Sequence, residues 1–274
     1  MSYVTNTNLS GLFANMYGRQ INNEIEKSME RLSTGLRINR AADDAAGMTI
    51  ANQLNKQSEG LLQANRNAND AIGLVKIADG ALDTYQKLLV EARDKALAAA
   101  SDTSSPESRA ALEEDVKQLM EQADDIAKQT SFNGINLLDG TFTDKKFHVG
   151  FEAGQTVDMS IANTDIASMG VSDSDLDLTT QTGADAAITS IDAAIKNIDN
   201  IRANIGSTQN ALESRIKVND VTAVNVKAAE SQIRDIDYAE ETERLNKNNI
   251  KAQANAFALS KSFESQSLVL NLLR

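Results

Sequence analysis

The stretch IGLVKIADGALDTYQKLLVEARDKALAA, residues 72–99, repeats apolar residues at intervals of three and four and contains no proline. Side chains at this spacing share one face of a helix, so the pattern predicts an amphipathic helix. The same spacing extends back to about Ala41. We therefore expect one continuous helix over 41–99, of about 59 residues and about 90 Å at about 1.5 Å per residue. Such a length is typical of a helical rod rather than of a compact core.

Helical patterns also lie further along the chain. The only proline, Pro106, follows Ser105, and this pair is typical of a helix N-cap and its first residue. We expect this helix to end near Lys128. Isoleucines three and four apart predict another helix, which begins after residue 182 and runs to about Ala229.

The region between these helices has a different pattern. Asn133-Gly134 and Asp139-Gly140 favour tight turns, and residues 147–149 and 157–161 alternate as short strands do. Residues 165–183 are rich in Asp, Ser, Thr and Gly and predict an exposed loop. The sequence therefore predicts a mainly α fold, a long antiparallel helical rod or coiled coil with a small β-hairpin region in the middle of the chain.

The two ends of the chain carry matching apolar patterns. Residues 1–37 and 238–274 both lack proline and repeat apolar residues at helical spacing. A lone helix would leave such a stripe in water, so each end needs partners to bury it, and we predict that copies associate through these ends. The residues predicted for this contact are Leu9, Leu12, Phe13, Ile21, Ile25, Leu32, Leu245, Ile250, Phe257, Leu259, Phe263, Leu270 and Leu273.

Charge divides the chain in the same way. Residues 101–235 hold 23 acidic and 11 basic residues, a balance of −12 that equals the net charge of the whole chain. The nearly neutral ends can pack side by side without repulsion, while the acidic middle stays solvated. This balance also argues against nucleic acid or an anionic membrane as the main partner. No apolar run is long enough to span a bilayer as a helix.

Residues suited to catalysis or metal binding are few. The chain has one histidine, His148, and no cysteine. Asp43 and Asp44 are adjacent, so on a helix they point about 100° apart and share a site poorly. Asp173, Asp175 and Asp177 alternate in a loop but lack the glycine and glutamate of an EF-hand. We therefore expect that the protein is not an enzyme and that it binds no cofactor and no metal ion.

Four stretches carry a family resemblance. They are RLSTGLRINRAADDAAGM at 31–48, TSFNG at 130–134, AESQIRDIDYAEET at 229–242 and LVLNLLR at 268–274. Together they strongly resemble bacterial flagellin over essentially the whole chain, with the variable outer insertion of longer members reduced or missing.

The resemblance implies a structural subunit that self-assembles into the helical filament of the bacterial flagellum and so enables swimming. It also implies secretion through the flagellum's own channel, an extracellular location, and contact with an export chaperone and with cap and junction proteins. The polar N-terminus, without an ordinary signal peptide, agrees with that route. The implied organisation is an inner-tube helix over 1–40, rod helices over 41–130, a β-hairpin and outer loop over 131–182, a rod helix over 183–235 and a second inner-tube helix over 236–274.

Two further expectations come from the resemblance. The family's contact with Toll-like receptor 5 aligns with Glu91, Arg93, Asp94 and Lys95, and with Gln209, Asn210 and Ala211 on the opposing helix. Glu91, Lys95 and Ala211 differ from the residues of sensed members, so we expect weak or absent binding. Some flagellins carry O-linked sugars on the outer loop, where the candidates here are Ser168, Ser172, Ser174, Thr179, Thr180 and Thr182.

Two alternatives stay open on the sequence. A flagellar hook–filament junction protein would share these helices but would stop at a small copy number. A secreted coiled-coil scaffold or effector would form a discrete oligomer. Electron microscopy after seeding distinguishes them, because only a filament subunit gives long filaments.

Overall fold

The computed structural model describes residues 7–172 and 176–272, with side chains as far as residue 268. Within these residues the fold is mainly α with two small antiparallel strand pairs, as the sequence predicted. The helices are α1 (Leu9–Thr34), α2 (Ala45–Ala100), α3 (Pro106–Gln129), α4 (Gln181–Arg234) and α5 (Tyr238–Leu272). The strands are β1 (Ser131–Phe132), β2 (Ile135–Asn136), β3 (Lys145–His148) and β4 (Thr156–Met159).

Local capping determines where the helices begin and end. Ser105 caps α3, since its side chain accepts a hydrogen bond from the Ser108 N–H, and Pro106 is the first helical residue. Gly35 ends α1 in the left-handed region at φ 72°, and its N–H donates to the Arg31 carbonyl. Helix α2 begins at Ala45 rather than near Ala41, because the Asp44 carboxylate accepts from the Gly47 N–H and so occupies the N-cap position.

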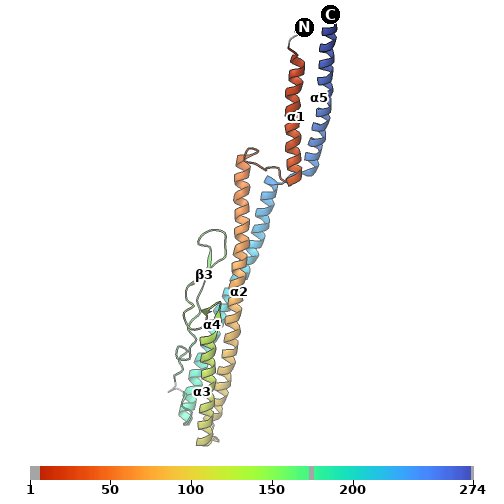
Figure 1. The fold of residues 1–274 in the computed structure, drawn as a ribbon. Helices are drawn as coiled ribbons and strands as arrows, with labels where there is room; N and C mark the ends of the chain where they lie inside the picture. Colours follow the sequence, from red (N-terminus) through yellow and green to blue (C-terminus); the bar gives the residue numbers. More distant parts are fainter. Residues whose placement is uncertain (1–6, 173–175, 273–274) are drawn as a thin grey trace. The chain divides into compact units, whose positions relative to one another are not determined.

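The described residues divide into two compact units, to which α2 and α4 both contribute. The terminal unit comprises 7–56 and 225–272, and the central unit comprises 57–172 and 176–224. In the terminal unit α1 and α5 lie side by side and antiparallel, with the start of α1 beside the later turns of α5 (Figure 1).

The central unit is built on α2 and α4, which run antiparallel. Asn65 bonds Asp220 and Arg93 bonds Asp192, so positions that rise along one helix fall along the other. The core between these helices and α3 contains fully buried Leu82, Tyr85, Leu89, Ile191, Ile198 and Leu212.

The strand pairs lie at the predicted places. β1 pairs with β2 through a tight turn in which Asn133 has φ 50° and Gly134 has φ 78°, as an Asn-Gly hairpin requires. β3 pairs with β4 in antiparallel register, with Phe147 opposite Val157. Phe142 and Phe147 stack with ring centroids 6.5 Å apart, which ties the hairpin to the adjoining chain.

The segment after β4 differs from the sequence-based expectation. Residues 165–183 were predicted to be an exposed loop, yet Met169, Val171, Leu176 and Leu178 are buried in the core of the central unit. The four apolar side chains are scattered among Asp, Ser and Thr, so the average composition of the segment hides them. Helix α4 also begins within the predicted loop, at Gln181, capped by the Thr180 hydroxyl.

No helix in the described part of the chain is long and apolar enough to cross a membrane.

Candidate assembly surface

Small and polar residues line much of the contact between α1 and α5. The Asn255 side-chain amide donates to the Ala14 carbonyl at 2.9 Å. Gly18 makes room for it, because a Cβ at that position would lie 2.6 Å from the Asn255 Nδ2 atom. Such close approach lets the two helices pack with little apolar surface between them.

A second polar contact lies nearer the chain ends. The Ser262 hydroxyl bonds the Asn8 Oδ1 atom at 3.0 Å, and the same oxygen accepts from the Gly11 N–H at 2.8 Å. Asn8 therefore caps α1 and also contacts α5. We call the two faces that meet through these residues the seam.

Five of the residues predicted for association between copies are partly buried in the contact between α1 and α5 of a single copy. They are half-buried and alternate along the two helices with seam residues: Ile21, Ile25, Leu32, Leu245 and Leu259. Part of the apolar pattern of the chain ends is therefore used inside one copy.

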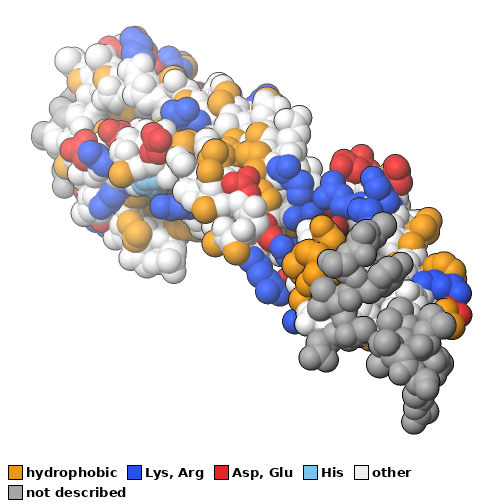
Figure 2. Space-filling model, turned by 90° about the horizontal axis from the view of Figure 1, so that it is seen from above, with side chains coloured by type: hydrophobic (Ala, Val, Ile, Leu, Met, Phe, Trp, Pro, Cys, Tyr) orange, Lys and Arg blue, Asp and Glu red, His pale blue; other side chains and the backbone are white. Residues whose placement is uncertain are grey.

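The remaining described candidates are exposed. Leu9, Leu12 and Phe13 are 55 %, 62 % and 57 % exposed. Helical spacing puts Leu9 and Phe13 on the face of α1 opposite Gly11 and Gly18, with Leu12 at the flank of that face. Ile250 and Phe257 are 67 % and 65 % exposed, seven residues apart on the face of α5 opposite Asn248 and Asn255. Phe263, also exposed, lies at the edge of the seam. Apolar side chains at the surface among charged ones are visible in Figure 2.

We call these two faces, away from the seam, the outward faces. The faces that meet thus combine small and polar residues with half-buried apolar ones, while large apolar side chains remain on the faces in water. Leu273 lies outside the described residues, and so does the side chain of Leu270.

The end of the pair is closed by a joint of short backbone contacts. The Arg37 N–H donates to the Arg234 carbonyl at 2.7 Å, and the Ile236 N–H donates to the Gly35 carbonyl at 3.0 Å. The Arg37 guanidinium adds a bond of 2.7 Å to the Ile233 carbonyl. These bonds tie the chain that leaves α1 to the chain that enters α5.

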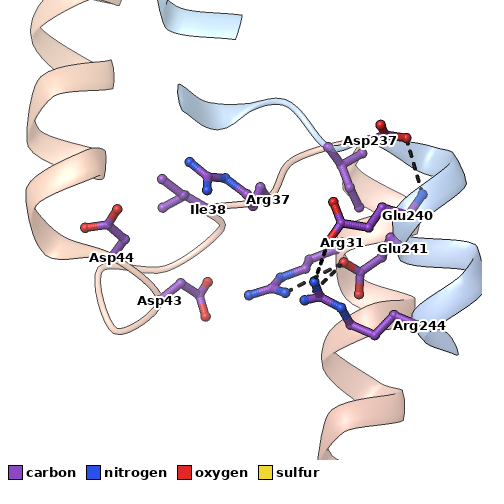
Figure 3. Close-up of a pocket in the computed structure, with 10 residues that line it drawn as sticks. Arg31, Arg37, Ile38, Asp43, Asp44, Asp237, Glu240, Glu241 and Arg244 are labelled. Atoms are coloured by element: carbon purple, nitrogen blue, oxygen red, sulfur yellow. Dashed lines mark hydrogen bonds and ion pairs between the residues drawn. The ribbon is translucent and has the colours of Figure 1, made fainter. Parts of the chain in front are cut away.

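An ionic cluster lines a pocket of about 410 Å³ beside this joint (Figure 3). The buried Glu241 carboxylate lies 3.8 Å from both Arg31 and Arg244. Asp43 accepts hydrogen bonds from the Arg40 and Asn39 N–H groups, and the Arg40 bond is the main cause that lowers the pKa of the Asp43 carboxyl. The carboxylates of Asp43 and Asp44 thus each accept hydrogen bonds from backbone N–H groups. Within the described residues no group of three metal-ligating side chains occurs.

The residues aligned with a receptor contact lie on the central unit. Arg93 pairs with Asp192 at 2.6 Å and Lys95 pairs with Asp115 at 2.8 Å, while Glu91 and Asp94 are exposed. Gln209 donates to Glu213 on its own helix, and Asn210 and Ala211 are exposed. Since Asp192 lies opposite Arg93, Gln209 is about 25 Å further along α4. The structure therefore does not bring these two stretches together.

The candidate sugar-bearing residues are exposed where they are described. Ser168, Ser172, Thr179, Thr180 and Thr182 lie at the surface, and Ser174 lies outside the described residues. The Thr179 hydroxyl donates to Asp177, and the Thr180 hydroxyl caps α4.

Sequence reasoning missed the seam. Gly18, Asn255 and Ser262 are small or polar, so a search for apolar periodicity passes over them. The signal that could have found them is Gly11, Ala14 and Gly18 at intervals of three and four, which is typical of closely packed helices.

Comparisons with known proteins identify one family over nearly the whole chain. Residues 5–143 match the bacterial flagellin N-terminal helical region and residues 188–273 match the bacterial flagellin C-terminal helical region. A flagellin of Halalkalibacterium halodurans is 37 % identical over 92 % of this chain and 93 % of its own length. A flagellar filament 33 kDa core protein of Treponema phagedenis is 35 % identical over 99 % of this chain and 100 % of its own length.

Solved structures include the same family. The crystal structure of Bacillus cereus flagellin is 29 % identical and covers 56 % of this chain and 88 % of its own, with a TM-score of 0.50. The family matches over 5–143 and 188–273 contain α1, α2, α3, most of α4 and α5. The chain therefore belongs to the bacterial flagellin family and is a structural subunit of the flagellar filament.

Proposed function

We propose that copies of this chain polymerise through the outward faces of α1 and α5. One observation carries the proposal: the terminal pair leaves Leu9, Leu12, Phe13, Ile250 and Phe257 in water. Burying a large apolar side chain gains about 1.5–3 kcal/mol, so several buried at each subunit supply a substantial drive for association. Ile21, Ile25, Leu32, Leu245 and Leu259 are half-buried on the faces that meet within one copy, and they take part in the contact between copies through their exposed edges.

The test compares two exposed leucines. Leu12→Ser removes an apolar side chain from the outward face of α1, whereas Leu97→Ser removes one of similar exposure, 55 %, from the central unit. We expect Leu12→Ser to raise the monomer concentration needed for filament growth by roughly tenfold, and Leu97→Ser to change it much less. Sedimentation of seeded filaments measures both. Equal effects of the two substitutions would count against the outward faces.

The route to the filament belongs to the same proposal. A chaperone helps to export the subunit through the flagellar channel to the cell exterior. The subunit is then added to the filament beneath a cap, at a position beyond the junction proteins. Family membership supports this route, and the absence of cysteine means that no disulfide hinders threading of the chain. Loss of the protein from the medium of cells that lack the flagellar export apparatus would support it, and undiminished secretion would contradict it.

We also propose that the free subunit activates Toll-like receptor 5 weakly or not at all. Glu91 is exposed where sensed flagellins carry an arginine, and Lys95 is held by Asp115. The Lys95–Asp115 pair is exposed to solvent, which screens it, so it contributes little to stability. The double substitution Glu91→Arg, Lys95→Leu should therefore leave the fold intact and increase signalling in a reporter cell line. Strong activation by the native subunit would contradict the proposal.

A further inference from the structure

Methionine is the most readily oxidised side chain in this protein. The sequence has seven methionines and neither cysteine nor tryptophan. A two-electron oxidant such as hydrogen peroxide converts the methionine thioether into a sulfoxide, and it reacts fastest with a side chain that is open to solvent. The exposure of each methionine therefore decides which of them react in the folded subunit.

The described methionines differ widely in exposure. Three are buried in the core of the central unit and are between 3 % and 6 % exposed: Met120, Met159 and Met169. Met48 is half-buried. Met16 and Met29 are 51 % and 59 % exposed, and both belong to α1. Among the described residues, hydrogen peroxide therefore reaches the methionines of α1 first.

Met16 lies on the outward face of α1. It follows Leu9 by seven residues and Phe13 by three, so helical spacing puts the three side chains on one face. Met29 is 13 residues beyond Met16, which places it about 140° around the helix from Met16 at about 100° per residue. Of the methionines in the described part of the chain, Met16 alone belongs to an outward face.

We propose that Met16 is an oxidation site that decides whether a free subunit can enter the filament. One oxygen atom of hydrogen peroxide is transferred to the Met16 sulfur, which gives up two electrons, and the peroxide is reduced to water. The product carries a polar sulfoxide oxygen on a side chain that was apolar. Burial of this acceptor beside Leu9 and Phe13 without a hydrogen-bond donor is unfavourable, so the oxidised face no longer suits an apolar contact.

This inference rests on the polymerisation through the outward faces that is proposed above. In that arrangement a neighbouring copy covers Met16, so the sulfur reacts in the free subunit and is protected in the filament. Hydrogen peroxide then blocks the addition of free subunits and leaves finished filaments intact. Met29 is at least as exposed but lies off the outward face, so its oxidation leaves assembly unchanged.

Peptide mass spectrometry measures where the chain is oxidised. Brief treatment of the purified monomer with hydrogen peroxide should oxidise Met16 and Met29 at least about tenfold faster than the buried methionines of the central unit. In preformed filaments the rate at Met16 should fall at least about tenfold, since a neighbouring copy excludes the reagent. An unchanged rate at Met16 on assembly, or equal rates at all methionines of the monomer, would overturn the inference.

Two leucine variants separate the effects of the two exposed sulfurs on growth. Leucine has a similar volume and helix propensity to methionine and has no sulfur to oxidise, so M16L and M29L each remove one exposed thioether. After peroxide treatment, M29L should need an at least about tenfold higher monomer concentration for filament growth, while M16L should grow as it did before treatment. Sedimentation of seeded filaments measures both. The thermal unfolding midpoint of the M29L monomer should not change on oxidation, because Met16 lies at the surface.

The outcomes are distinct. Equal peroxide sensitivity of M16L and M29L, or growth of oxidised M29L at its original concentration, would overturn the inference. A lower unfolding midpoint of oxidised M29L would also overturn it, because the sulfoxide would then act through the fold of the monomer. These results leave the proposed polymerisation standing as long as the untreated chain forms filaments. Failure of the untreated chain to assemble would contradict the polymerisation itself, and the inference with it.

Discussion

At the scale of single residues, small and polar side chains fix how the terminal helices meet. Asn255 reaches the Ala14 carbonyl across Gly18, and Ser262 bonds the Asn8 side chain that caps α1. Polar side chains at a helix contact set register, because a shift along the axis leaves them without partners. These residues therefore determine which apolar side chains of the pair remain outside.

Asn255→Ala should weaken assembly. Loss of its hydrogen bond costs about 0.5–1.5 kcal/mol, so we expect the critical concentration for filament growth to rise roughly threefold to tenfold. The control is Asn249→Ala, an exposed asparagine on the same helix that should have no effect. The two critical concentrations, measured by sedimentation, decide the matter. Similar values would show that the Asn255 bond does not contribute to the pairing.

At the scale of elements, some boundaries follow from the sequence and others do not. The start of α3 at Ser105-Pro106 and the Asn133-Gly134 hairpin depend on local backbone preferences, so the sequence predicted them. The burial of Met169, Val171, Leu176 and Leu178 depends on a core supplied by distant helices, and nothing in the local composition indicates it.

The candidate assembly surface could likewise be predicted only in part from the sequence. Apolar periodicity marks both terminal helices as association elements, and it does not say which apolar residues are used within one copy. That division depends on close packing at Gly18 and Asn255, which only the fold reveals. Ile21 and Leu12 look alike in the sequence, but one is half-buried beside the seam and the other is exposed.

The buried segment after β4 gives a prediction about stability. Leu178 is fully buried, so Leu178→Ala should lower the free energy of unfolding of the central unit by about 2–4 kcal/mol. Leu97→Ala, at an exposed position, is the control and should change it by less than about 1 kcal/mol. Urea unfolding of the soluble monomer measures both. Replacement of the segment 165–182 by a Gly/Ser linker should for the same reason destabilise the unit, whereas an exposed loop, as the sequence predicted here, would tolerate it.

At the scale of the whole molecule, the two units have different kinds of surface. The central unit buries a continuous core of Leu, Ile and Ala, and residues 101–235, most of which belong to it, hold the acidic excess of the chain. The terminal unit exposes large apolar residues on both sides of a narrow seam. A chain of this kind keeps part of its apolar surface unburied until other copies supply a partner, which suits a subunit whose stable state is the polymer.

An electron cryo-microscopy map of filaments grown from the purified chain tests this account most directly. We expect the map to show Leu12 and Phe257 buried against neighbouring copies, with the hydrogen bond from Asn255 to the Ala14 carbonyl kept in the seam between α1 and α5. A map in which Leu12 and Phe257 face solvent, with subunits joined only through their central units, would contradict the account.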